Sequence, residues 1–266
     1  MAWRDAGPRT MGRNEMNGGK DFLVTVLLTG GIWTALAPAD LAGQQARDFL
    51  FGEPNVSLAF NMGYGIPKAG SEIFDFVTDE LTLEKSDFRA MVVGGTFGIR
   101  VTPRTEVALD VSYSNANTPS EFRRWVDMDD LPIEQRTRLT MVPVTVSMKA
   151  YLFERGRRIS SFAWVPGTWS PFVGVGGGRL YYDFKQVGDF VDFETNEIFW
   201  DTFQSDGNTG VFHVLAGAEY SLSPSFYITG EGRYSWAEAD MDRDFIDFDA
   251  IDLSGFQATV GLAVRF

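Results

Sequence analysis

The feature that most constrains this chain is an alternation of apolar with polar or small side chains, which recurs in eight segments after about residue 50. Successive side chains of a strand point to opposite faces, so a period of two predicts strands with one apolar face. The segments are 55–64, 88–101, 106–115, 137–153, 171–184, 211–222, 226–238 and 256–266. Of these, 171–184 is rich in glycine and ambiguous in phase. The chain is therefore predicted to be all-β.

The composition of the two faces favours a membrane over water as the surroundings. The faces opposite the apolar ones carry small and polar residues such as Thr96, Ser112, Ser147 and Thr259, with few lysines or glutamates at mid-strand. Such residues suit the narrow lumen of an eight-stranded barrel, which side chains fill. A soluble lipocalin-type barrel also alternates, but with its apolar face inward. We predict an eight-stranded antiparallel up-and-down transmembrane β-barrel.

Aromatic residues near the ends of the apolar faces support the membrane interpretation. Transmembrane barrels carry aromatic girdles at both membrane interfaces. The residues in question are Tyr64, Tyr113, Tyr220, Phe226, Trp236, Phe256 and Phe266.

The connections between the segments are expected to alternate in length, as they do in bacterial membrane barrels. Residues 102–105 and 223–225 form short turns that contain proline. Long loops are expected to start near Ile66, Ala116, Lys185 and Ala239. The connection 154–170 should lie on the short side yet is long, and the sequence gives no role for it.

Residues 1–45 are predicted to be a signal peptide, with the barrel domain at 46–266. Basic residues Arg9, Arg13 and Lys20 precede an apolar run at 22–36, and small residues follow it, so cleavage is expected at about 37–46. The alternative for this segment is a buried or anchoring helix. The chain has no cysteine, which excludes disulfides and a cysteine-linked lipid anchor.

Four segments resemble the eight-stranded outer-membrane barrels of the OmpA and OmpW type: 141–146 (MVPVTV), 170–178 (SPFVGVGGG), 217–220 (GAEY) and 260–266 (VGLAVRF). The resemblance implies a monomeric protein of the Gram-negative cell outer membrane, in contact with membrane lipid and lipopolysaccharide. It also implies that the last strand, which ends in Phe266, is recognised by the barrel-assembly machinery. An OmpA-type periplasmic domain is missing, which argues against peptidoglycan binding.

Charged residues on the predicted inner face are expected to pair, because a lone charge in a narrow lumen is costly. We predict a charged-pair plug in a protein with a structural or surface-interaction role. The alternatives are an ion path, or a narrow OmpW-like channel for small hydrophobic molecules. The residues are Arg100, Glu106, Asp110, Lys149, Glu219, Glu231, Arg233 and Arg265, with Arg179 as a further candidate.

No enzyme is predicted. The only histidine, His213, would need a serine and an acid nearby to resemble the lipid-A deacylases of this barrel size. Ser147 or Ser235 would approach it only by accident of strand register. One histidine without cysteine also makes a zinc site improbable, and no cofactor motif is present. The net charge of −13 disfavours nucleic acid as a partner.

The last long loop is acidic and resembles a calcium loop, but Phe245 stands where such a loop requires glycine. We expect a solvated loop that gathers divalent cations weakly. Its acidic residues are Asp240, Asp242, Asp244, Asp247, Asp249 and Asp252. The aromatic residues of the loops suggest a contact surface, or loops that fold over the barrel mouth. They are Phe74, Phe76, Phe190, Phe193, Phe199, Trp200, Phe245 and Phe248.

Overall fold

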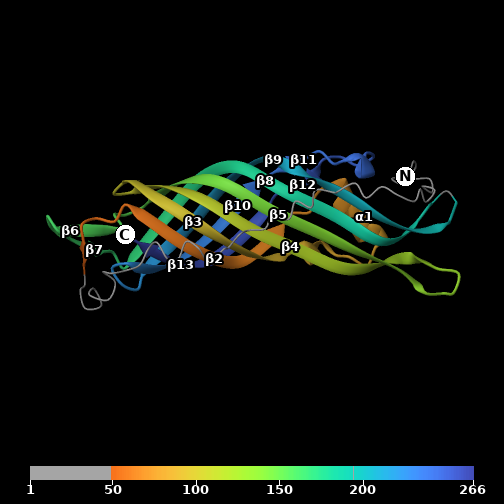
Figure 1. The fold of residues 1–266 in the computed structure, drawn as a ribbon, viewed down its shortest axis with the longest axis horizontal. Helices are drawn as coiled ribbons and strands as arrows, with labels where there is room; N and C mark the ends of the chain where they lie inside the picture. The colour runs from red at the N-terminus through yellow and green to blue at the C-terminus, as the bar shows by residue number, and fades with distance from the viewer. Residues whose placement is uncertain (1–48, 194) are drawn as a thin grey trace, which may run out of the picture. The chain divides into compact units, whose positions relative to one another are not determined.

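The computed structural model describes residues 49–193 and 195–266, and its main element is a closed barrel of eight antiparallel strands (Figure 1). The strands are β2 (Val56–Pro67), β3 (Ala90–Thr102), β4 (Thr105–Val126), β5 (Pro132–Tyr151), β8 (Trp169–Val191), β9 (Ile198–Ser221), β10 (Phe226–Trp236) and β13 (Gly255–Arg265). Each strand pairs with its neighbours along the chain, and β13 closes the ring by pairing with β2. The predicted up-and-down barrel is confirmed.

The barrel turns its apolar face outward. Val173 and Val175 of β8 are exposed, whereas the alternate residues Phe172 and Gly174 face the interior. All seven girdle aromatics of the prediction are exposed as well. This arrangement is the inverse of a water-soluble barrel and matches the lipid-facing belt of a membrane barrel.

The strands β4, β5, β8 and β9 continue well beyond the predicted segments. β8 and β9 have 23 and 24 residues, about twice the roughly 9–11 that cross a bilayer. The prediction of long loops that start near Ala116 and Lys185 is therefore wrong. Residues 127–131 alone join β4 to β5, and residues 192–197 alone join β8 to β9.

A change in polarity explains why these extensions escaped prediction. In β8 the exposed valines end at Val175, and the outward positions then pass through Tyr181 to the charged Asp183 and Lys185. Leu180, Tyr182 and Phe184 point inward instead and are buried. Inside the bilayer the outward face of the strand is apolar, because it contacts lipid. Where the strand continues into water, its apolar side chains lie on the inward face instead, so the apolar and polar faces exchange without a break in the strand. The inversion also accounts for the ambiguous phase of segment 171–184.

The end of the barrel that carries the long connections, here called the loop end, has a core of its own. Residues 68–89 contain helix α1 (Glu72–Glu80) and the 3-10 turn η2 (Lys85–Phe88), and residues 237–254 contain β11 (Glu238–Ala239), η3 (Arg243–Phe245) and β12 (Ile251–Asp252). Phe74 of α1 and Phe245 of η3 both pack their rings on Phe184 of β8. The ring centroid of Phe184 lies 6.1 Å from that of Phe74 and 5.5 Å from that of Phe245. We call the buried set Phe74, Phe88, Phe184, Phe190, Phe203 and Phe245 the loop-end core.

The opposite end, here called the turn end, carries a small separate sheet. It consists of β1 (Leu50–Phe51), β7 (Ala163–Pro166) and β6 (Gly156–Ser160), in the order β1-β7-β6. Figure 1 shows β6 and β7 beside the C-terminus, at the end of the barrel away from α1. The unexplained connection 154–170 is therefore largely a hairpin, and Trp164 on it is 2% exposed.

The extended strands have edges that the loop segments cover. On β9, the backbone N–H groups of Asp206 and Gln204 donate to the carboxylates of Asp242 and Asp244, over 3.0 and 3.2 Å. On β4, the N–H of Glu121 donates to Thr82 Oγ1 over 2.9 Å. Unpaired strand edges invite aggregation, so these contacts protect the extension.

The predicted signal peptide lies outside the described residues. Within residues 49–193 and 195–266, no helix has the length and hydropathy needed to cross a membrane.

Candidate functional site

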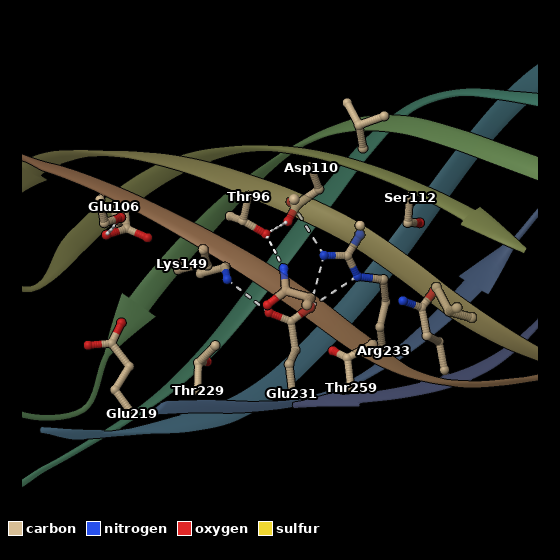
Figure 2. A pocket seen from close by; sticks show the side chains of 18 of the residues that line it. Thr96, Glu106, Asp110, Ser112, Lys149, Glu219, Thr229, Glu231, Arg233 and Thr259 are labelled. Carbon is tan, nitrogen blue, oxygen red and sulfur yellow. Dashed lines mark hydrogen bonds and ion pairs between the residues drawn. The ribbon is translucent and has the colours of Figure 1, made fainter. Parts of the chain in front are cut away.

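The interior of the barrel holds two groups of ionised side chains, of which the first lies at mid-height. This central cluster consists of Asp110, Lys149, Glu231 and Arg233, from β4, β5 and β10 (Figure 2). Lys149 Nζ lies 2.8 Å from Glu231 Oε2, and Arg233 Nη2 bridges Glu231 Oε1 at 2.8 Å and Asp110 Oδ2 at 3.3 Å. Two acids and two bases make the central cluster neutral.

Two hydroxyl groups also donate hydrogen bonds to the carboxylate of Asp110. Thr96 donates to its Oδ1 and Ser147 to its Oδ2, each over 2.8 Å, while Asn61 donates to Thr96 over 2.8 Å. A buried carboxylate is tolerable only when its oxygens are paired in this way. The alternation of β2, β3, β4 and β5 places Asn61, Thr96, Asp110 and Ser147 on the inner face.

The second group, here called the turn-end cluster, consists of Glu106, Glu219, Arg155 and Arg265. Arg155 reaches Glu219 through Nε at 3.2 Å and Nη2 at 3.1 Å, and its Nη1 lies 2.5 Å from Glu106 Oε2. Arg265 stacks on the ring of Tyr227 at 4.2 Å and lies 4.0 Å from Glu219 Oε2. This cluster is also neutral, with two acids and two bases.

Arg155 is the residue that sequence reasoning missed. It lies in the connection 154–170, outside any alternating segment, yet it is 8% exposed and sits inside the lumen. Only the return of this connection over the barrel end brings it there. The sequence does show three arginines in this connection, at positions 155, 157 and 158. Nothing in the sequence distinguishes Arg155, which enters the lumen, from the other two.

Seven of the eight predicted lumen charges belong to the two clusters, and Arg100 does not. Arg100 forms an ion pair with Glu53, which precedes β2, and Glu53 also holds Arg158 of β6 at 2.9 Å. Arg100 therefore ties the small sheet to the barrel. Arg179 points outward and is exposed, so it does not join the lumen set.

The ion pair with Arg100 also governs the acidity of Glu53, which lies at the turn end outside the spanning strands. The hydrogen bond from Arg100 lowers the pKa of this carboxyl below 4.5; burial acts in the opposite direction and the hydrogen bond from Arg158 adds to the lowering. Glu53 is thus held as a carboxylate between two arginines.

A small polar cavity of about 40 Å³ adjoins the central cluster. Asn61, Ser112, Thr229, Gln257 and Thr259 contribute to its lining. One water molecule needs roughly 10–15 Å³ of such space, so the cavity suits a few waters. Figure 2 shows that Lys149 and Arg233 point toward Glu231 at this cavity, and that Arg233 also points toward Asp110.

His213 lies nearer to a serine than expected. The register of β5, β8 and β9 brings Ser147 Oγ to 3.0 Å from His213 Nε2, the approach that the sequence analysis left to an accident of strand register. However, the one hydroxyl proton of Ser147 is donated to Asp110, and among the described residues His213 Nδ1 has no hydrogen-bond partner. A nucleophile, a base and an orienting acid are therefore not aligned as a hydrolase requires. His213 is also 0% exposed.

The acidic loop is partly engaged in the fold. Asp242 and Asp244 accept backbone hydrogen bonds from β9, and Asp252 pairs with Lys68 at 3.0 Å. Asp247 and Asp249 are exposed, and Asp240 accepts a hydrogen bond from Tyr182 through its backbone oxygen. In the described part of the chain, no three acidic or histidine side chains are grouped to hold a metal ion.

The loop aromatics divide into buried and exposed members. Phe74, Phe190 and Phe245 are at most 1% exposed and belong to the loop-end core, whereas Trp200 is 68% exposed. The buried members pack on one another at the loop end, where Phe245 contacts both Phe184 and Phe203.

No protein-family model matches this sequence, and no curated protein matches it. Several solved structures are similar in fold. The outer membrane protein OprG from Pseudomonas aeruginosa aligns with a TM-score of 0.47 and 11% identity, over 82% of this chain and 99% of its own. Neisserial surface protein A aligns with a TM-score of 0.44 and 11% identity, over 83% and 98%.

The N-terminal β-barrel domain of OprF from Pseudomonas aeruginosa has 13% identity and a TM-score of 0.36, over 80% of this chain and 98% of its own. At such identities the likeness concerns the fold alone. The closed barrel with its outward apolar belt and ionised interior is shown by the chain's own structure.

Proposed function

Because this chain is an eight-stranded outer-membrane β-barrel, we propose that its lumen is sealed and that it serves a structural or surface-interaction role without enzymatic activity. The observation that carries the proposal is Arg155, which enters the lumen from the turn end and forms ion pairs with both Glu106 and Glu219. Without Arg155 the turn-end cluster would hold two acids and one base.

Three levels of closure support the proposal. The turn-end cluster lies below the central cluster, and the loop-end core lies above both. Trp164 from the small sheet adds a ring that lies 5.8 Å from the guanidinium of Arg265. A hydrated ion would have to displace buried, paired charges at two levels, and breaking such pairs is costly.

The test is conductance in planar bilayers. We expect the native protein to show no sustained channels. Arg155→Ala should open the turn end and leave two carboxylates there, so that any current it carries should favour cations. Arg157→Ala is the matched control, since Arg157 lies on the same connection and is exposed. Steady conductance by the native protein, equal to that of Arg155→Ala, would refute the sealed lumen.

The assembly role of the last strand remains part of the proposal. Phe266 is 58% exposed at the end of β13, and its backbone oxygen accepts hydrogen bonds from Asn55 and Val56 at 3.1 Å. The side chain is thus free for recognition, while the backbone closes the ring.

A further inference from the structure

Arg179 occupies an unusual place, on the lipid-facing surface of β8. Its neighbours along the strand, Leu180 and Gly178, belong to the inner face, while Val175 and Tyr181 share its outward face and are 51% and 49% exposed. Across the sheet it lies opposite Val144 of β5 and Gly210 of β9. An arginine among outward apolar residues requires a partner of opposite charge or access to water.

The height of Arg179 places it at the outer rim of the apolar belt. Trp169 at the turn end of β8 is 63% exposed and packs its ring on Tyr220 at 4.9 Å, as expected of the lower girdle. Ten residues separate Trp169 from Arg179, which is about 33 Å of strand. At a strand tilt of about 40° this rises about 25 Å, the height of the apolar band. Beyond Arg179 the outward positions become charged, at Asp183 and Lys185.

No described residue of the protein supplies an anion for Arg179. Within residues 49–193 and 195–266 it forms no ion pair or hydrogen bond through its side chain. The acid next along the same face, Asp183, is already engaged by Arg138 and by Gln204, each at 2.8 Å.

The surface beside Arg179 is open. A Cβ placed on Gly210, directly across from Arg179, would meet nothing within 4 Å. Gly177 also lies on the outward face, two residues before Arg179. The missing side chains leave room for a group to approach the guanidinium from the lipid side.

We propose that Arg179 binds a phosphate group of the lipopolysaccharide headgroup in the outer leaflet. The long connections of bacterial barrels face outward, so the loop-end rim of the belt meets that leaflet. A guanidinium donates two parallel hydrogen bonds to a phosphate, and the low polarity of the belt strengthens the contact. The inference rests on the membrane position of the barrel and is independent of whether the lumen is sealed.

The test measures lipid binding to the purified, folded barrel by native mass spectrometry in detergent. Diphosphoryl lipid A is the probe, with chemically dephosphorylated lipid A and phosphatidylglycerol as comparisons. We expect Arg179→Ala to weaken binding of diphosphoryl lipid A about tenfold, as loss of a charge-assisted pair does. Native protein should bind dephosphorylated lipid A as weakly as the variant binds the phosphorylated form.

The matched control is Arg136→Ala. Arg136 is also an exposed outward arginine, but it pairs in register with Val187, eight residues past Arg179 on β8, which is about 26 Å farther along the strand. Its binding should stay within about twofold of the native protein. A shift in gel mobility on heating would verify that each variant is folded.

Three results would overturn the proposal. The first is unchanged lipid A binding by folded Arg179→Ala. The second is equal binding of phosphorylated and dephosphorylated lipid A. The third is phosphatidylglycerol bound as tightly as diphosphoryl lipid A, which would assign Arg179 to phospholipid phosphate in general.

Discussion

Arg155 and Glu219 form a two-point ion pair inside the turn end of the lumen, although they stand 64 positions apart in the sequence. Tyr151 donates a further hydrogen bond of 2.7 Å to the same carboxylate. The pair links the connection 154–170 to the barrel wall, so a segment that lies outside the eight strands becomes part of the interior.

Replacement of Arg155 by alanine should destabilise the barrel. Glu106 and Glu219 would be left buried with a single cation, and losing one partner of a buried ion pair costs about 3–5 kcal/mol. Urea unfolding in detergent micelles measures the change. The variant Arg155→Ala/Glu219→Gln should recover part of the loss, because it removes one uncompensated charge. Equal stabilities of Arg155→Ala and native protein would contradict the pairing.

Gly176→Ala should disturb the centre of the barrel. A Cβ on Gly176 would lie 2.5 Å from the backbone oxygen of Val146 and 2.6 Å from His213 Nε2. Relief of such an overlap costs about 1–3 kcal/mol in a packed interior. Gly230→Ala is the matched control, because a Cβ there meets nothing within 4 Å. If both substitutions had the same effect on the unfolding free energy, the close packing around His213 would be refuted.

Asp252 should make the packing of residues 68–89 against residues 237–254 depend on pH, because its carboxylate pairs with Lys68. It receives hydrogen bonds from the backbone of Ser254 at 3.0 Å and an ion pair from Lys68 at 3.0 Å. Burial alone would raise its pKa, but these contacts outweigh burial and hold the pKa below 3.8. The stabilisation is therefore complete above the ordinary pKa and is lost as the pH falls through the lower, folded value.

Hydrogen exchange of residues 68–89 measures this closure. Protection should fall in acid for the native protein, whereas Asp252→Asn should show weaker protection near neutral pH and less dependence on pH. Asp249→Asn, at an exposed position, serves as the control. Protection that fell equally with acid in Asp252→Asn would point to another group.

Phe245→Ala should loosen the loop-end core without unfolding the membrane barrel. Phe245 is 1% exposed and packs on Phe184 and Phe203 at 5.5 and 6.3 Å. Truncation of a buried phenylalanine costs about 3–5 kcal/mol locally. We expect trypsin to cleave faster after Arg243, while the heat-dependent gel shift persists. Ile246→Ala is the control, because Ile246 is 77% exposed. Unchanged cleavage would show that the core does not depend on this ring.

Removal of Phe266 should impair assembly more than stability. The side chain is exposed, so its loss removes little packing from the folded barrel. Delivery to the outer membrane should fall, as measured by the folded band in outer-membrane fractions, whereas refolding of purified protein in detergent should be retained. Phe226→Ala, at another exposed girdle position, is the control. Normal delivery without Phe266 would remove it as the assembly signal.

The sequence by itself determined the number of strands, their antiparallel order and the outward apolar face. These follow from local alternation and from the short turns, since a period of two needs no knowledge of distant contacts. It also determined that Asp110, Lys149, Glu231 and Arg233 face inward, because each stands on the inner phase of its strand.

Tertiary structure alone decided which charges meet and what closes the two ends. Arg155 enters the lumen because a connection folds back over the barrel, and Arg100 lies outside the two clusters because its ion pair is with Glu53. Strand register, set across neighbouring strands, places Ser147 beside His213. The extensions of β8 and β9 were hidden for a related reason: their apolar face switches sides where the bilayer ends, and only the folded barrel shows where that is.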